Sequence, residues 1–206
     1  MYPLFNKHLD LSKQYFEKLL KPGDIAIDAT CGNGHDTLYM ASRILTENSG
    51  TLYTLDIQKE ALESAIMLLK ESIPDSHFKR IHFLEMSHET FPSEIAKNSV
   101  KLIIYNLGYL PGGDKAITTM SHTTLKSIKN SMEMISFEGA ISITCYPGHP
   151  AGKIEEDLIL EFVSNLDHRA WNCCHHRFVN REKGPSLLIL QKQPIVYKTN
   201  KALRAE

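Results

Sequence analysis

A short acidic and glycine-rich stretch near the start of the chain has residue types that can bind a nucleoside ligand. An apolar run over 25–29 contains Asp28 near its end, and Gly32 and Gly34 follow directly. Glycines let the backbone turn tightly and approach a ligand closely. In sheets built from alternating strands and helices, ligands bind at the carboxyl ends of the strands, where this turn would lie. The stretch is therefore a candidate binding site.

The same turn lacks the features of the two common phosphate-binding motifs. A dinucleotide fingerprint would have a third glycine at position 37, where this chain has Thr37, and no Walker A lysine follows. A carboxylate at position 28 would also repel a phosphate. Asp28 suits a cationic amino-acid group instead, such as that of S-adenosylmethionine.

A second acidic residue, Asp56, ends the next apolar run. At the end of a neighbouring strand its carboxylate can accept both hydrogen bonds of a ribose diol. Each aspartate has a structural alternative, because Asp56 can cap the helix expected near Gln58 and Asp28 can stabilise a turn. Their positions at adjacent strand ends favour cofactor binding. Ser87 and His88 follow the third run and would border the adenine, although His88 can also be a plain loop residue.

The segment after the fourth apolar run has a pattern that can position an amine. It reads Asn106-Leu-Gly-Tyr109 and resembles the Asn-Pro-Pro-Tyr motif of amino-methylating enzymes, with Leu107 and Gly108 in place of the prolines. A nitrogen that attacks a methyl group must hold its lone pair in line with the breaking bond. The side-chain oxygen of Asn106 can accept the amine's hydrogens, while the ring of Tyr109 packs against a base. The alternative is a plain glycine-rich loop.

Two further residues near this segment could remove a proton. Aliphatic amines are mostly protonated at neutral pH, so a methyl acceptor must first lose a proton. Asp114 could attract the amine or act as a general base, and it could equally pair with Lys115 or cap a helix. His149, within Tyr146-Pro-Gly-His-Pro150, could be a base or a residue that shapes the loop.

The run Cys173-Cys174-His175-His176 has the composition of a metal-binding cluster. Consecutive residues of a strand point to alternate faces, so these four cannot converge on one tetrahedral ion. We therefore expect no metal site.

These candidates fall between elements that alternate along the chain. Apolar runs that read as strands cover 25–29, 51–57, 81–85, 100–105, 140–146, 172–179 and 186–190. Helical patterns cover 11–20, 37–45, 59–69, 119–135 and 154–165, with a weaker one near 93–97. This alternation predicts a Rossmann-like α/β fold with a mainly parallel, doubly wound sheet of seven strands. A polar turn alone joins the last two runs, which predicts a C-terminal antiparallel hairpin at one edge.

Length and composition fit one domain. The chain has 206 residues, of which 42% are hydrophobic and 23% charged, close to ordinary globular usage. We expect a single domain over 1–193 and a polar tail over 194–206. No apolar run reaches the roughly 20 residues that span a bilayer. The four cysteines lack framework spacing, which favours reduced thiols and a cytoplasmic location.

The formal net charge of −1 argues against a broad basic face for nucleic acid. A local basic patch is compatible with it. The cations after Arg169 are Arg177, Arg181, Lys183, Lys192, Lys198, Lys201 and Arg204, against Glu182 and Glu206. This segment could contact RNA or be a solvated terminus.

Five motifs together resemble the YtqB/MnmM family, long described as rRNA methylases. They are Asp28-Ala-Thr-Cys-Gly-Asn-Gly-His-Asp-Thr37, Asp56-Ile-Gln58, Ser87-His-Glu89, Asn106-Leu-Gly-Tyr-Leu-Pro-Gly-Gly-Asp114 and Tyr146-Pro-Gly-His-Pro150. The resemblance implies a class I methyltransferase fold and S-adenosylmethionine as methyl donor. As substrate it implies the aminomethyl group of 5-aminomethyl-2-thiouridine at the tRNA wobble position. It also implies that Asp28, Asn33, Asp36, Thr37, Asp56 and Gln58 line the cofactor site.

We therefore expect an S-adenosylmethionine-dependent N-methyltransferase whose substrate is tRNA. We expect no contact with a membrane, and the sequence is compatible with a homodimer. The rivals are a methyltransferase for rRNA or a small-molecule amine, and a protein that binds the cofactor without turnover. The candidate catalytic residues are Asn106, Tyr109, Asp114 and His149. The candidate cofactor-binding residues are Asp28, Thr30, Gly32, Asn33, Gly34, Asp36, Thr37, Asp56, Gln58, Ser87, His88 and Asn106.

Overall fold

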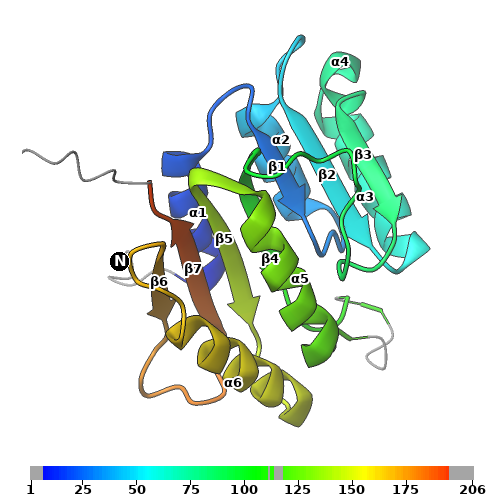
Figure 1. Ribbon diagram of the computed structural model, residues 1–206. Helices are drawn as coiled ribbons and strands as arrows, with labels where there is room; N and C mark the ends of the chain where they lie inside the picture. Colours follow the sequence, from blue (N-terminus) through cyan, green and yellow to red (C-terminus); the bar gives the residue numbers. More distant parts are fainter. Residues whose placement is uncertain (1–6, 111, 114–117, 195–206) are drawn as a thin grey trace, which may run out of the picture.

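A seven-stranded sheet forms the centre of the protein (Figure 1). The computed structural model describes residues 7–110, 112–113 and 118–194. The strands are β1 (Ile25–Asp28), β2 (Thr51–Asp56), β3 (Ile81–Glu85), β4 (Val100–Asn106), β5 (Ile135–Cys145), β6 (Trp171–His176) and β7 (Ser186–Lys192). Their order is β3-β2-β1-β4-β5-β7-β6; the first five in this order pair in parallel, and β7 is antiparallel to both β5 and β6. The predicted sheet with its C-terminal antiparallel hairpin is confirmed.

Helices cover both faces of this sheet (Figure 1). One layer contains α1 (His8–Leu19), α2 (His35–Ile44) and α3 (Lys59–Ser72); the other contains α5 (Ser121–Met134) and α6 (Pro150–Ser164). Side chains of β4 alternate between the two cores: Leu102 and Ile104 face the first layer, and Ile103 and Tyr105 face the second. Strands buried on both faces are expected of a parallel sheet covered by helices.

The strand order changes direction between β1 and β4, and this point positions the candidate site. The chain moves outward from β1 to β3 and then returns to β4 on the other side of β1. The N–H of Ala29 donates to the carbonyl of Ile104 at 3.0 Å, which joins the two strands at their carboxyl ends. Ligands of open α/β sheets bind outside the carboxyl ends at such a switch point. Asp28, Asp56 and Asn106 each end a strand at this edge.

Two local predictions are wrong. The weak helix near 93–97 is a series of turns between Pro92 and Asn98, which has a left-handed φ of +57°. β5 begins at Ile135 rather than at position 140, with a register irregularity opposite the start of β4. Glu138, at φ +61°, and Gly139 lie in the added part. Charged residues and glycine are depleted in strands, so the pattern did not indicate one there. A short helix, α4 (Asp75–Phe78), was also not predicted.

The ends of the chain are described only in part. Of the tail predicted over 194–206, Pro194 alone lies within the described residues. Among the helices of the described ranges, none combines the length and the apolar character needed to cross a membrane.

Candidate active site

The turn after β1 is stabilised by the carboxyl group of Asp28. This residue is fully buried. Its Oδ2 accepts a hydrogen bond from the Thr37 hydroxyl at 2.6 Å, and its Oδ1 accepts one from the backbone N–H of Thr30 at 3.2 Å. Because Asp28 is also fully buried, a ligand cannot reach the remaining acceptor positions of these oxygens, and any attraction of Asp28 for a ligand is through its charge.

Gly34 lies where this turn meets α2. Its φ is +82°, and a Cβ atom there would lie 2.6 Å from the Cβ of Ala65 on α3. A glycine is required for both reasons, because other residues disfavour left-handed φ and real Cβ atoms do not approach so closely. The close approach places the N-terminus of α2, with its free N–H groups, at the carboxyl edge of the sheet.

Asp56 connects the glycine turn to the next strand–helix unit. Its Oδ2 accepts from the N–H of Gly32 and its Oδ1 from the N–H of Gln58, each at 2.9 Å. The second bond forms an Asx turn just before α3, whose N-cap is Gln58, so Asp56 does not have the helix-capping role named above as the alternative. An ionised carboxylate offers about four acceptor positions, so the half-buried Asp56 retains capacity for a ribose diol. Ile57 is 55% exposed beside it and offers an apolar surface that the sequence did not single out.

The turn concentrates negative charge. Burial raises the pKa of Asp28 to about 7; the hydrogen bond from Thr37 opposes this rise, and the charges of Asp36 and Asp56 add to it. Three carboxyl groups whose charges act on one another disfavour an anionic ligand and favour a cationic one. This matches the expectation from Asp28 alone.

Asn106 is oriented by Asp36 from α2. The amide Nδ2 of Asn106 donates to Oδ2 of Asp36 at 2.6 Å, and its backbone N–H donates to the Thr30 hydroxyl at 2.7 Å. An ionised carboxylate only accepts hydrogen bonds, so it determines which of the two amide atoms faces it. The oxygen Oδ1 of Asn106 is then the amide atom free to accept from a ligand.

The loop after β4 approaches the loop after β5. The N–H of Gly108 donates to the Thr119 hydroxyl at 2.9 Å, and that hydroxyl donates to the buried Glu155 of α6 at 2.9 Å. Tyr109 is 42% exposed, and its ring centroid lies 6.5 Å from that of His149. The structure therefore brings Tyr109 and His149 together. Asp114 lies outside the described residues.

His149 begins α6 as its N-terminal cap. Its Nδ1 accepts a hydrogen bond from the N–H of Gly152 at 3.1 Å. In a neutral ring the proton is then on Nε2, which is buried and has no hydrogen-bond partner among the described residues. The geometry favours the loop-shaping alternative, with Nε2–H as a donor, over a base that accepts a proton at this ring.

Ser87 and His88 follow β3, and His88 packs inward. The His88 ring is edge-on to Tyr105 at 5.9 Å between centroids, and Ser127 donates to its carbonyl at 2.5 Å. Burial lowers the pKa of His88, while the charge of Asp56 raises it. His88 therefore lies within electrostatic range of the predicted ribose-binding residue.

Helix α1 contributes His8, whose contact with Tyr146 of the loop after β5 was not revealed by the sequence. Nε2 of His8 lies 3.3 Å from the hydroxyl of Tyr146, and the two rings meet edge to face with centroids 5.6 Å apart. Burial lowers the pKa of His8 and raises that of Tyr146 to about 12, and the charge of Asp36 acts on both. These residues are 138 positions apart, so no local pattern could have joined them.

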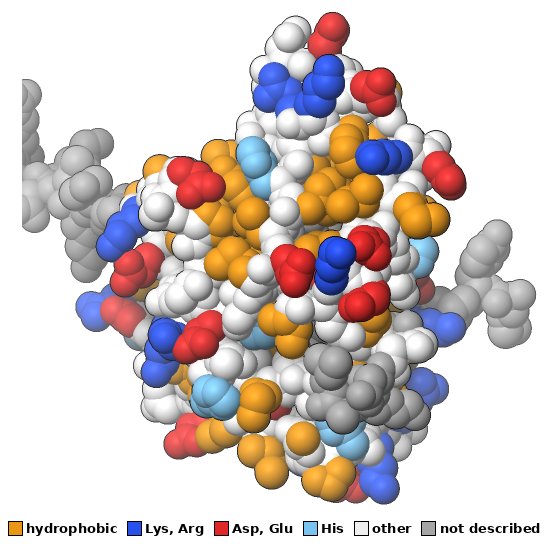
Figure 2. Space-filling model, turned by 90° about the vertical axis from the view of Figure 1, so that its right-hand side faces the viewer, with side chains coloured by type: hydrophobic (Ala, Val, Ile, Leu, Met, Phe, Trp, Pro, Cys, Tyr) orange, Lys and Arg blue, Asp and Glu red, His pale blue; other side chains and the backbone are white. Residues whose placement is uncertain are grey.

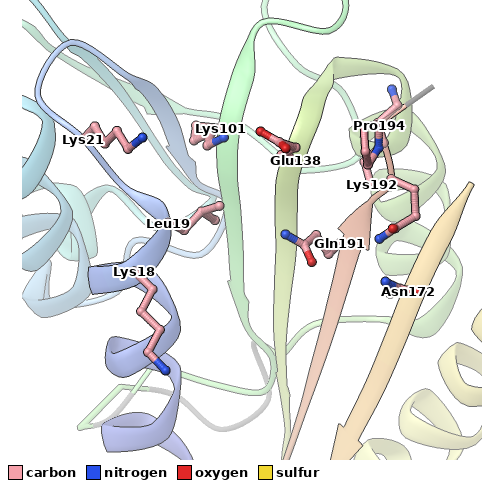
Figure 3. A pocket seen from close by; sticks show the side chains of 10 residues that line it. Lys18, Leu19, Lys21, Lys101, Glu138, Asn172, Gln191, Lys192 and Pro194 are labelled. Carbon is pink, nitrogen blue, oxygen red and sulfur yellow. The ribbon is translucent and has the colours of Figure 1, made fainter. Parts of the chain in front are cut away.

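A separate cavity of about 390 Å³ lies at the other end of the strands (Figure 3). Its walls include Lys101 at the start of β4 and Glu138 near the start of β5. Lys18 and Lys21, from the end of α1 and the residues after it, lie at its opposite side. Its position away from Asp28, and its lysines, separate it from the candidate site.

Comparison with known proteins identifies the family. A tRNA (mnm(5)s(2)U34)-methyltransferase, chloroplastic, from Arabidopsis thaliana is 35% identical over 191 residues, which are 91% of this chain and 70% of the relative. The family model described as "Putative rRNA methylase" matches residues 52–192. The chain belongs to the YtqB/MnmM family. It is an S-adenosylmethionine-dependent methyltransferase with a class I fold.

Two solved structures of similar proteins agree with the YtqB/MnmM assignment. A "putative rRNA-methylase" from Clostridium thermocellum has a TM-score of 0.85 at 30% identity and covers 92% of this chain and 100% of its own. A "putative methyltransferase" from Streptococcus mutans, in complex with SAH, has a TM-score of 0.79 at 28% identity and covers 92% and 99%. The site described above fits the cofactor, because its carboxyl groups suit the cationic donor and the half-buried Asp56 keeps acceptor positions for a ribose diol.

The affinity for S-adenosylmethionine should rise with pH. Because the pKa of Asp28 is about 7 without ligand, a cationic ligand that favours the carboxylate must release a proton on binding. We expect the dissociation constant to be about three- to tenfold larger at pH 6 than at pH 8. Isothermal titration calorimetry in buffers of different ionisation enthalpy measures the dissociation constant and the number of protons released on binding.

The control for this pH dependence is Asp28→Asn. An asparagine can still accept from Thr30 and donate to Thr37, so the turn keeps both hydrogen bonds. This variant should bind more weakly with a flat pH profile. Equal pH dependence in the two proteins would contradict the role given to Asp28.

Proposed function

We propose that this enzyme methylates the aminomethyl nitrogen of 5-aminomethyl-2-thiouridine at the tRNA wobble position. The observation that carries the proposal is the Asp36–Asn106 hydrogen bond, because it leaves Oδ1 of Asn106 as an acceptor beside the donor site. An amine nitrogen has hydrogens to donate to such an oxygen, and its lone pair is then directed away from it. The name of the Arabidopsis thaliana relative supports the same nucleoside.

The residues of the candidate site would have separate roles in binding the donor and in positioning the amine. Asp28, Asp56 and the turn around Gly34 hold the donor, whose sulfonium supplies an electrophilic methyl group when bound. Oδ1 of Asn106 accepts an N–H of the substrate amine and aims its lone pair at that methyl. As the N–CH₃ bond forms, the S–CH₃ bond breaks and its electron pair stays on sulfur, so the positive charge passes to nitrogen.

Two groups would assist around this reaction. Tyr109 would pack against the uracil ring, and His149 beside it would shape the loop that borders this ring. The amine must lose one proton before attack, and Asp114 remains the predicted acceptor for it. A cytoplasmic location and a homodimer also remain predictions.

Nucleoside analysis of a strain that lacks the gene tests the proposal. Total tRNA from that strain should contain 5-aminomethyl-2-thiouridine in place of its N-methylated form, because the proposed methyl acceptor would then stay unmethylated. Mass spectrometry of digested tRNA and rRNA measures both nucleosides. Restoration by the wild-type gene is the control. Unchanged wobble-uridine methylation, or a loss confined to rRNA, would contradict the proposal.

A further inference from the structure

The loop between β6 and β7 carries an excess of positive charge on a protein whose net charge is −1. This basic loop, residues 177–185, contains Arg177, Arg181 and Lys183 against the single acid Glu182. All four side chains are exposed. The loop also holds Val179, which is 90% exposed. An exposed segment of this kind is a candidate contact surface.

The cations of the basic loop differ from other surface cations in the partners that the described residues offer them. Charges of both signs lie next to one another on the β3 side of the molecule (Figure 2). Surface cations also form ion pairs in the described chain: Lys97, for example, pairs with Glu133 at 2.7 Å. In the described part of the chain, by contrast, no acidic side chain forms an ion pair with a cation of the basic loop. The guanidinium of Arg181 instead lies 4.6 Å from the ring centroid of Phe178. Stacking on an aromatic ring orders an arginine and keeps its donors available.

The basic loop lies at the edge of the sheet that carries the donor site. Because β7 is antiparallel to β5, the β6–β7 connection meets the carboxyl ends of the parallel strands (Figure 1, orange). The carbonyl oxygen of Lys183 lies 3.5 Å from the position a Cβ on Gly148 would take. Gly148 precedes His149, so the basic loop touches the segment that would border the substrate base.

We propose that the basic loop binds the phosphate backbone of the tRNA arm that presents the methyl acceptor. This inference rests on the proposed function, because it takes the substrate nucleoside to be part of a tRNA. Guanidinium groups match phosphate geometry through two parallel hydrogen bonds, and an unpaired cation gains most from such a contact. Phosphate contacts fix the position of a nucleic acid without reading its sequence. The basic loop therefore sets how tightly tRNA is held, and the Asn106 segment determines what is methylated.

The test is a variant with Arg177→Gln, Arg181→Gln and Lys183→Gln together. Each lost phosphate contact lowers the slope of log affinity against log salt by about 0.7–0.9, so the variant should lose about 2 in slope. Its dissociation constant for aminomethylated tRNA should rise about 10- to 100-fold at 0.15 M salt. Its affinity for S-adenosylmethionine and its kcat at saturating tRNA should not change. Fluorescence anisotropy with labelled tRNA measures binding independently of methyl transfer.

A second triple variant is the matched control. Lys18→Gln, Lys21→Gln and Lys101→Gln remove the same charge from the cavity at the opposite edge of the sheet. This control should leave the tRNA affinity within about twofold of wild type. Charges that lie farther from the bound tRNA than the Debye length of about 8 Å are largely screened from its phosphates.

The outcomes separate the two proposals. If the wild-type enzyme methylates no tRNA at all, the proposed function fails. If it methylates tRNA and the loop variant keeps wild-type affinity and salt slope, the function stands and the inference about the basic loop is overturned. An equal loss in both triple variants would also overturn it, because the effect would then be one of net charge alone.

Discussion

The Asn106→Ala enzyme should bind S-adenosylmethionine with wild-type affinity and yet transfer methyl groups about 100- to 1,000-fold more slowly. The reason is the direction of the lone pair. Asp36 holds the amide of Asn106 through Nδ2 at 2.6 Å, so the lost group is the oxygen that would accept from the amine. The backbone N–H of position 106 still bonds to Thr30 in the variant, so the donor turn keeps its support. Single-turnover transfer of a labelled methyl group measures the chemical step directly.

The matched control for Asn106→Ala is Asn172→Ala. Asn172 is exposed at the start of β6, at the far end of the sheet from the donor turn. Its variant should keep wild-type rates. A fully active Asn106→Ala enzyme would contradict the positioning role. Weaker cofactor binding with an unchanged single-turnover rate would show that Asn106 acts in cofactor binding alone.

Gly34→Ala should have the second large effect, on both stability and cofactor affinity. The new Cβ would lie 2.6 Å from the Cβ and 2.8 Å from the Cα of Ala65, at a φ of +82°. Left-handed strain costs about 1–2 kcal/mol and forced repacking about 1–3 kcal/mol more. A loss of about 2–5 kcal/mol in the free energy of unfolding corresponds to a melting temperature lower by roughly 5–15 °C. Because α2 and α3 must separate, S-adenosylmethionine should bind at least about tenfold more weakly.

The Gly23→Ala variant distinguishes the effect of backbone strain from the effect of the steric clash with Ala65. Gly23 also has a left-handed φ, of +96°, but the nearest atom to its Cβ is the Ser49 hydroxyl at an ordinary 3.5 Å. This variant should lose only the strain energy and keep its cofactor affinity. The double variant Gly34→Ala/Ala65→Gly should recover part of both losses. Equal behaviour of the two single variants would show that the contact with Ala65 has no role.

Fold and element order were predictable because they follow from periodicity and composition. Apolar runs marked the seven strands, and the polar connection before Ser186 indicated the antiparallel hairpin. Two segments did not follow the pattern. The start of β5 contains Glu138 and Gly139, whose place in the sheet depends on pairing with β4 rather than on their own propensity. The segment near 93–97 was too short for its apolar residues to distinguish a helix from turns.

The site was predictable to the extent that strand ends define it. Asp28, Asp56 and Asn106 could be assigned to one edge because parallel strands end together. What each side chain binds could not be predicted, because it depends on contacts between distant elements. The sequence did not indicate that Asp28 is buried under Thr37 or that Asp36 orients Asn106. The contact of His8 with Tyr146 depends on how α1 packs, which has no local signal.

The most direct test incubates the purified enzyme with S-adenosylmethionine labelled in its methyl group and with two matched tRNA preparations. One carries 5-aminomethyl-2-thiouridine at the wobble position, and the other carries an unmodified uridine there. Label should enter only the first preparation, as one methyl group on the aminomethyl nitrogen, and the Asn106→Ala substitution should nearly abolish this labelling. Equal labelling of both preparations, or of neither, would contradict the proposed function.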